Sequence, residues 1–108
     1  MKIERGEVWW VALDPTVGTE IQKSRPAAVV SNDATNAFGP RVVVVPITSN
    51  VARMFPGDAL VTVSGRPGRA LGDQMCSADK SRLQRRIGSL STDDLRAVEF
   101  ALRVTLDL

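Results

Sequence analysis

Short runs of branched and aromatic residues, each ended by proline, glycine or small polar residues, recur through most of this chain of 108 residues. Runs of this length and composition are typical of β-strands. The sequence predicts strands at residues 8–13, 27–30, 42–45, 60–63, 70–75 and 87–90. A turn rich in glycine and proline, residues 64–68, separates the fourth strand from the fifth. Pro46 follows the third run and has no N–H for a ladder, so we expect a bulge or a sheet edge beside residues 47–50.

The last segment changes its apolar period. Four residues fall on one stripe of a helix: Leu95, Val98, Leu102 and Thr105. Residues 91–94, Ser-Thr-Asp-Asp, supply an N-cap and acids for the first turn of this helix. Glu99 and Arg103 are spaced to pair on its solvent-facing side. Many short strands followed by one closing helix predict a single domain, residues 1–108, folded as a small, strongly bent antiparallel barrel with a C-terminal α-helix.

Two features of the composition remove whole classes of chemistry. The sequence contains no histidine, and Cys76 is its one cysteine. A Ser-His-Asp triad, a two-histidine ribonuclease mechanism, an internal disulfide and a cysteine metal cluster are therefore excluded. We expect no metal and no cofactor, and acid–base work is left to carboxylates, lysine, hydroxyls or arginine.

The charged residues permit a polyanionic partner. The net charge is +2, and eleven of the fourteen basic residues are arginine, whose planar fork grips phosphate through two bonds. Residues 1–7 are charged and lack the apolar core of a secretion signal, and no apolar run approaches the ~20 residues that span a membrane. We therefore expect a cytoplasmic protein without membrane contact.

Residues 14–25 form a polar connection longer than most loops, and loops of that size are usually functional or mobile. Pro26 forces the preceding Arg25 into extended geometry and so fixes where its side chain leaves the sheet. From the residues alone, Arg25 is either an anion-binding group or one half of a structural salt bridge, for example with Glu20. Thr48 lies just after Pro46, where the strands are expected to bend.

Several spaced motifs cover nearly the whole chain. In order they are Arg5-Gly6-Glu7-Val8-Trp9, Asp14-Pro15, Gly18-Thr19-Glu20, Arg25-Pro26, Val44-Val45-Pro46-Ile47-Thr48-Ser49, Asp73-Gln74-Met75, Asp79-Lys80-Ser81-Arg82-Leu83 and Ile87-Gly88. Together they resemble the MazF/PemK family of toxin endoribonucleases. The resemblance implies an SH3-like barrel of the MazF/CcdB type, a homodimer, and metal-independent cleavage of single-stranded RNA. It also implies a cognate antitoxin with an acidic disordered tail.

By this resemblance, Arg25 and Thr48 match the two catalytic positions of the family. Attack by the RNA's own 2′-hydroxyl needs no external nucleophile, and the expected products carry 2′,3′-cyclic phosphate and 5′-hydroxyl ends. Arg25 is assigned to charge stabilisation, because a guanidinium is a poor base, and Thr48 donates a further hydrogen bond. Glu20 matches a position implicated in activity, either taking the proton or remaining a solvated surface carboxylate.

The residues considered for RNA binding are Gln74, Ser49, Phe55, Arg82 and Arg86. Gln74 can donate and accept on a base edge, although it also fits an ordinary amide at a strand end. Phe55 lies in a predicted loop and is a candidate exposed contact. Arg82, Arg85 and Arg86 form a cluster that either holds phosphates or is simply a solvated face. For Trp9 and Trp10, packing in the core or at a subunit interface is preferred over base stacking.

The sequence departs from the family pattern in its 65–72 hairpin, which is short, and at Cys76, where a basic residue is common. RNA contacts from that hairpin are therefore not carried over. Two alternatives stay open: a CcdB-like toxin that binds gyrase without nuclease activity, and a non-catalytic RNA-binding regulator. The joint presence of Glu20, Arg25-Pro26 and Thr48 favours the nuclease, since a gyrase binder has no need to keep them together.

Overall fold

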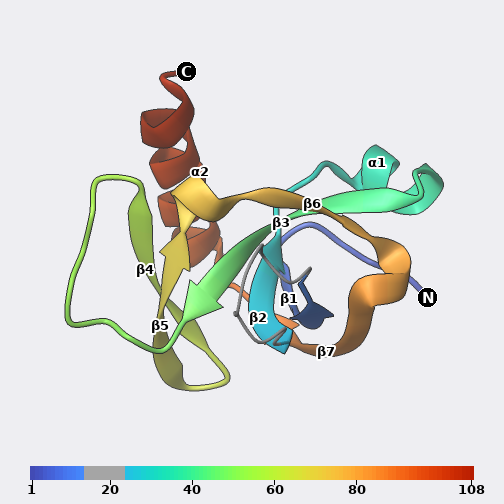
Figure 1. Ribbon diagram of the computed structural model, residues 1–108, viewed down its shortest axis with the longest axis horizontal. Coiled ribbons are helices and arrows are strands. Elements are labelled where there is room, and N and C mark those ends of the chain that lie inside the picture. The colour runs from blue at the N-terminus through green and yellow to red at the C-terminus, as the bar shows by residue number, and fades with distance from the viewer. Residues whose placement is uncertain (14–23) are drawn as a thin grey trace, which may run out of the picture.

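The computed structural model describes residues 1–13 and 24–108 (Figure 1). Its elements, in chain order, are β1 (Glu7–Ala12), β2 (Ser24–Val29), α1 (Asp33–Phe38), β3 (Arg41–Thr48), β4 (Asp58–Val63), β5 (Arg66–Leu71), the 3₁₀ turn η1 (Gly72–Gln74), β6 (Cys76–Asp79), the 3₁₀ turn η2 (Lys80–Arg82), β7 (Leu83–Ser89) and α2 (Thr92–Leu106). Within these ranges, no helix has the length and the apolar content needed to cross a membrane.

The strands form one curled antiparallel sheet, in effect half a barrel. Their order is β4-β5-β3-β2-β1-β7, and β6 pairs separately with β3. Helix α2 stands at the β4 end of the sheet (Figure 1), where the Thr62 N–H donates to the Asp94 carboxylate at 2.8 Å. The expected bent antiparallel barrel with a C-terminal helix is confirmed.

Strand β3 has partners on both edges, and proline explains where its pairing with β2 ends. Its first half pairs with β6, residues 44–46 pair with β2, and Ile47 and Thr48 pair with β5. The Val30 N–H donates to the Val43 carbonyl at 2.9 Å. In an antiparallel pair, the backbone N–H groups that point to one neighbour recur at every second residue, so the next donors from β2 to β3 would be residues 28 and 26. Residue 26 is proline and has no N–H. The β2–β3 ladder accordingly ends at Ala27↔Pro46, and the two strands separate.

The two faces of the sheet carry separate apolar clusters. One cluster lies toward α2 and comprises Val8, Ala28, Val45, Ile47, Ala59, Val61, Ala70, Leu90, Val98 and Ala101. The other comprises Ile3, Trp9, Val11, Ala27, Val29, Val42, Val44, Ala78 and Leu83. Strand β1 contributes to both, as its doubly apolar sequence predicts. The chain itself covers both Val8 and Trp9.

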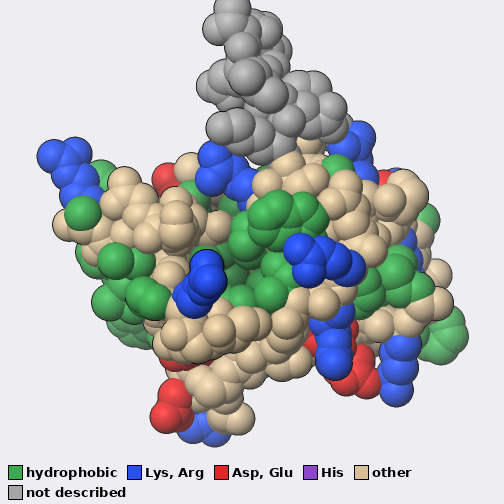
Figure 2. Space-filling model, turned by 90° about the horizontal axis from the view of Figure 1, so that it is seen from below, with side chains coloured by type: hydrophobic (Ala, Val, Ile, Leu, Met, Phe, Trp, Pro, Cys, Tyr) green, Lys and Arg blue, Asp and Glu red, His purple; other side chains and the backbone are tan. Residues whose placement is uncertain are grey.

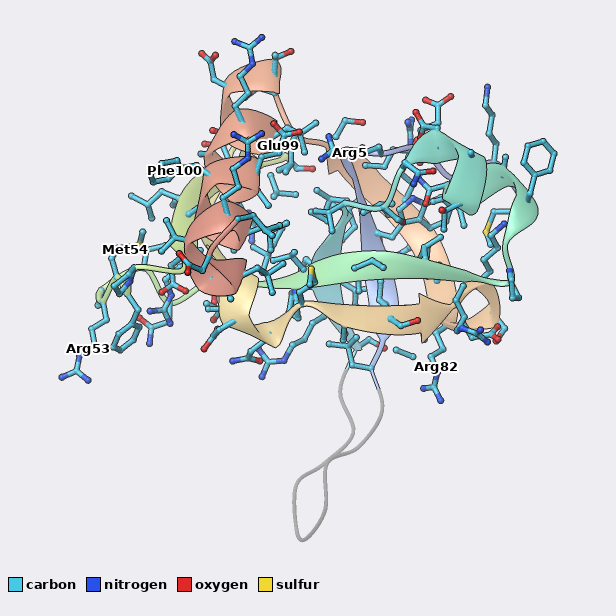
Figure 3. The ribbon with its side chains drawn as sticks, turned by 90° about the horizontal axis from the view of Figure 1, so that it is seen from above. Arg5, Arg53, Met54, Arg82, Glu99 and Phe100 are labelled. Carbon is cyan, nitrogen blue, oxygen red and sulfur yellow. The ribbon has the colours of Figure 1, made fainter. Side chains whose placement is uncertain are left out.

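Helix α2 begins as predicted. The Ser91 hydroxyl accepts the Asp94 N–H at 3.1 Å and caps the helix. Val98 is buried within the predicted stripe, whereas Thr105 is exposed. Glu99 forms an ion pair with Arg5 at 2.7 Å, so its partner comes from the N-terminal segment rather than from the next helical turn (Figure 3).

The predicted turn at 64–68 is shorter than expected. Ser64 and Gly65 have φ values of 51° and 77°, and a two-residue hairpin turn needs positive φ at both positions. Strand β5 therefore begins directly at Arg66. It stops at Leu71, and the expected continuation to 75 is replaced by η1.

Two short polar elements, and the first residues of two strands, were not predicted from the sequence. Helix α1 has only six residues and is capped by Asn32, whose side chain accepts the Thr35 N–H at 2.8 Å. Strand β6 is polar in sequence, and β2 and β7 begin earlier than their apolar runs, at Ser24 and Leu83. In each case hydrogen bonding to a neighbouring segment or a local cap, rather than an apolar run, makes the element.

A close backbone approach gives a stability prediction. The Gly72 N–H donates to the Gly57 carbonyl at 3.0 Å, and a Cβ at Gly72 would lie 2.3 Å from that oxygen. Gly72→Ala should lower the free energy of unfolding by about 1–3 kcal/mol, because backbone must move. At Gly88 the nearest atom to a Cβ is 3.4 Å away, so Gly88→Ala should be neutral or stabilising by up to about 1 kcal/mol. Urea denaturation measures both, and equal losses would contradict the assignment.

Candidate active site

An open cleft of about 600 Å³ lies where β2 and β3 separate. It is lined by Trp10, Ser24, Arg25, Pro26, Ile47, Thr48, Ser49, Val63, Ser64, Arg66, Pro67, Gly68, Arg85 and Ile87. Figure 2 views the molecule from the side of the β4–β5 turn and shows apolar side chains gathered at the centre of this face, with Lys and Arg side chains around them. The cleft therefore combines an apolar floor with a cationic margin.

Strand register builds one side of this cleft. Trp10 in β1 lies opposite Pro26 in β2 and opposite Arg85 in β7. Directly opposed residues of antiparallel strands share a face of the sheet, so these three side chains form a row across three strands. All three line the cleft.

The β4–β5 hairpin forms the facing side. A Cβ on Gly68 would lie 2.7 Å from the Ile47 side chain, so glycine allows β5 to lie close against β3 at this point. The Ser64 hydroxyl in the hairpin turn donates to the Ile87 carbonyl of β7 at 3.3 Å. That bond joins the two ends of the half barrel beside the cleft.

Arg25 and Thr48 both line the cleft, on the two strands that separate. Continuing the Ala27↔Pro46 register by two residues would place Arg25 opposite Thr48, but the β2–β3 pairing has already ended there. On its opposite edge, β3 pairs Thr48 with Arg69 of β5. Arg25 is exposed and Thr48 is half-buried. Both side chains are thus accessible from one solvent-filled space, which catalysis by these two residues requires.

The Thr48 hydroxyl has a defined role in its own turn. Its oxygen accepts the Asn50 N–H at 3.2 Å, and the Asn50 side chain in turn accepts the Ala52 N–H at 3.1 Å. Because the oxygen accepts within the protein, the hydroxyl hydrogen can still be donated to a ligand in the cleft.

The other candidate residues are dispersed. Ser49 lines the cleft with Thr48. Gln74 is exposed on η1. Phe55 is 55% exposed, and the guanidinium carbon of Arg69 lies 5.8 Å from the centroid of its ring. Neither residue belongs to the cleft lining. Glu20 lies within 14–23, outside the described residues.

The arginine cluster of the sequence is divided by strand alternation. Arg85 lines the cleft, with its guanidinium carbon 5.7 Å from the centroid of the Trp10 ring. Its neighbour Arg86 forms an ion pair with Glu7 at 3.1 Å. The buried Glu7 carboxylate also accepts the Trp9 Nε1–H at 3.1 Å, which fixes Trp9 in the core.

Arg82 occupies a third environment. Its side chain donates to the Ala12 carbonyl at the end of β1 at 3.3 Å, and Figure 3 shows it projecting from the edge of the fold. The Asp79 side chain caps the preceding turn. Its acceptance of the Ser81 N–H at 2.9 Å is the main cause of an Asp79 pKa below its ordinary value.

The charged side chains in the described lining of the cleft are Arg25, Arg66 and Arg85, with no carboxylate among them. Three cations around one apolar floor favour an anionic ligand. Trp10, Arg66 and the 67–68 segment were not expected at the site. Alternation along β1 and β7 could have indicated Trp10 and Arg85, but the hairpin residues join only through tertiary folding. In residues 1–13 and 24–108, no three His, Cys, Asp or Glu side chains cluster as a metal site.

The family model of the PemK-like, MazF-like toxins of type II toxin–antitoxin systems matches residues 4–106. The chain belongs to this family. It is 41% identical over 115 residues to Endoribonuclease MazF9 of Mycobacterium tuberculosis (strain ATCC 25618 / H37Rv), and the match covers 98% of each protein.

Solved structures of this family share the fold. A MazF crystal structure from Deinococcus radiodurans (Form-I) matches with a TM-score of 0.84 and 27% identity, over 100% of this chain and 99% of that one. A mycobacterial endoribonuclease in complex with its cognate antitoxin matches with a TM-score of 0.81 and 25% identity, over 98% and 96% of the two chains. The PemK/MazF match favours the toxin endoribonuclease over the CcdB-like and regulator alternatives.

The opposite orientations of Arg85 and Arg86 predict losses of stability of different size. Arg86→Ala leaves a carboxylate, Glu7, whose side chain is 9% exposed, without its cationic partner. We expect a loss of about 1–2 kcal/mol in the free energy of unfolding, since Arg86 is itself half in solvent. Arg85→Ala should cost less than about 1 kcal/mol. Urea denaturation of the two variants tests this, and equal losses would show that the two arginines are not divided in this way.

Proposed function

We propose that this member of the PemK/MazF family is a toxin that cleaves single-stranded RNA, messenger RNA above all, without a metal ion. The observation that supports this most directly is the joint position of Arg25 and Thr48 on one open cleft, whose described charged lining is entirely arginine. Since messenger RNA is the proposed substrate, the cytoplasm is the proposed compartment.

In the proposed reaction, the 2′-hydroxyl oxygen of one nucleotide bonds to the adjacent phosphorus, and the bond from phosphorus to the 5′-oxygen breaks. The products carry a 2′,3′-cyclic phosphate and a 5′-hydroxyl. Arg25 binds two phosphate oxygens as negative charge grows, and the Thr48 hydroxyl donates to the same group. Glu20 is the proposed acceptor of the 2′-hydroxyl proton, and the departing 5′-oxygen takes a proton from solvent.

We assign the remaining candidates to the flanking nucleotides. Ser49 lies beside Thr48 on the cleft and is placed to contact the nucleotides at the cut. Gln74, Phe55 and Arg82 lie outside the cleft, so they would contact RNA farther along the strand. Arg86 is held by Glu7, and its proposed phosphate contact requires that ion pair to open.

A cognate antitoxin is the second proposed partner. One structural relative is described as an endoribonuclease in complex with its cognate antitoxin, and other relatives are MazE–MazF structures. For this chain we propose an antitoxin whose acidic, disordered tail folds into the arginine-lined cleft and covers it. Arg25, Arg66 and Arg85 supply the complementary charge.

The test of the nuclease is cleavage of a long single-stranded RNA in excess EDTA, with the fragment ends mapped. Arg25→Ala should lower the rate at least ~100-fold, because a donor to the developing charge is lost. Thr48→Ala should lower it about tenfold, the effect of one hydrogen bond. Arg41→Ala, an exposed arginine at the far end of β3, is the matched control and should cut normally.

Each result has a distinct meaning. Intact RNA with wild-type protein in EDTA would refute metal-independent cleavage. Undiminished cutting by Arg25→Ala would refute the site assignment, and undiminished cutting by Thr48→Ala would remove that hydroxyl from it. Circular dichroism of the variants confirms that each is folded.

We further propose a homodimer that forms through the outer side of α2. The exposed large apolar side chains of the described residues, apart from Met1, Phe38 and the Phe55 assigned to RNA, come from 51–60 and 100–108. Figure 3 shows Met54 and Phe100 beside α2 on the outer side of the molecule. Apolar side chains gathered in this way mark protein contact surfaces.

Light scattering after size-exclusion chromatography tests the dimer. Phe100 is 69% exposed on α2, and Phe100→Asp should yield a monomer because a charge would be buried at the contact. Phe38 is 90% exposed on α1, and Phe38→Asp should leave the dimer intact. A dimer that survives Phe100→Asp, or a monomeric wild type, would contradict the proposed surface.

A further inference from the structure

The adjacent residues Trp9 and Trp10 have opposite environments. Trp9 is 6% exposed, packs in an apolar cluster and donates its Nε1–H to Glu7. Trp10 is only half-buried, belongs to neither core cluster, and lines the cleft. A large aromatic side chain that the core does not use is available to a ligand.

The Trp10 ring and the Arg85 guanidinium lie together in the cleft. Arg85 lies opposite it in the β1–β7 register and holds its guanidinium over the ring, with 5.7 Å from the guanidinium carbon to the ring centroid. Pro26 lies opposite it on the other side, in β2. Indole and guanidinium are both planar groups on which a nucleobase stacks.

The surroundings select for a ring attached to an anion. Ile47, Val63 and Ile87 supply apolar walls to the same cleft, and Arg25 and Arg66 supply positive charge at its margin. A nucleotide combines a flat base with a charged phosphate. An acidic peptide would satisfy the arginines but has no general need for a planar platform.

We propose that Trp10 and Arg85 form a subsite that stacks a nucleobase of the RNA, next to the phosphate held by Arg25 and Thr48. This inference rests on the proposed nuclease function and extends it by naming the residues that bind a base. Because every base has a stacking face, this subsite supports binding without reading sequence by itself.

Fluorescence detects the stack directly. The ligand is an oligonucleotide containing the mapped cut site, 2′-O-methylated throughout so that it lacks the nucleophile and stays intact. In Trp9→Phe the remaining tryptophan is Trp10, and its emission should be quenched on binding. In Trp10→Phe the remaining Trp9 is buried on the other face of the sheet, and its emission should change little.

Affinity and kinetics supply a second measurement. Trp10→Ala should raise Kd and KM about 5- to 100-fold with little change in kcat, the effect of losing one stacked base. Trp10→Phe keeps an aromatic ring and should recover most of the affinity. Trp9→Phe is the matched control and should leave KM unchanged.

Abasic nucleotides, introduced one at a time, identify the stacked base. At one position the abasic substitution should weaken binding to wild type but not to Trp10→Ala. Equal losses in both proteins at every position, or an unchanged KM for Trp10→Ala, would overturn the subsite while leaving cleavage by the wild type in place. A Trp10→Ala defect confined to binding of an acidic antitoxin peptide would also overturn it. Failure of wild type to cut RNA would instead refute the nuclease itself.

Discussion

Pro26 has no hydrogen to donate to β3, and the cleft depends on that missing bond. The ladder that begins with the Val30 N–H and the Val43 carbonyl ends at Ala27↔Pro46, one residue before the position at which proline removes the donor. Beyond it, β3 continues into a pairing with β5. The start of β2 and the end of β3 are therefore unpaired with each other, and each carries one of the proposed catalytic side chains on the cleft.

Because side chains alternate between the two faces of a strand, β1 and β7 each contribute both to the stability of the fold and to the cleft. In β1, Trp9 faces the core while Trp10 faces the cleft, and in β7, Arg86 is paired with Glu7 while Arg85 lies over Trp10. Trp9 and Arg86 stabilise the fold. Trp10 and Arg85 are left for a ligand, in a cleft whose described lining has cations and no counterion, so that an anion lowers the repulsion among the cations.

Much of the fold was predictable from local patterns. The apolar runs located the central parts of the strands, and Ser91 with the acids after it located the start of α2, because caps and apolar periods act over a few residues. Helix α1 and strand β6 were not predictable in this way, because a polar six-residue helix and a polar strand have no apolar period. The ion pair of Glu99 with Arg5, in place of the expected pair with Arg103, was not predictable either, because Arg5 is distant in sequence.

The sequence by itself determined the excluded chemistries, the motifs of the PemK/MazF family, and the extended geometry that proline imposes on Arg25. Only the tertiary structure decided that Thr48 shares a cleft with Arg25, that the hairpin contributes Arg66, and that the neighbouring arginines of β7 serve different faces. The physical reason is register. A shift of one residue between two strands turns every side chain to the opposite face, and pairing between segments distant in sequence is set by the packing of the whole core.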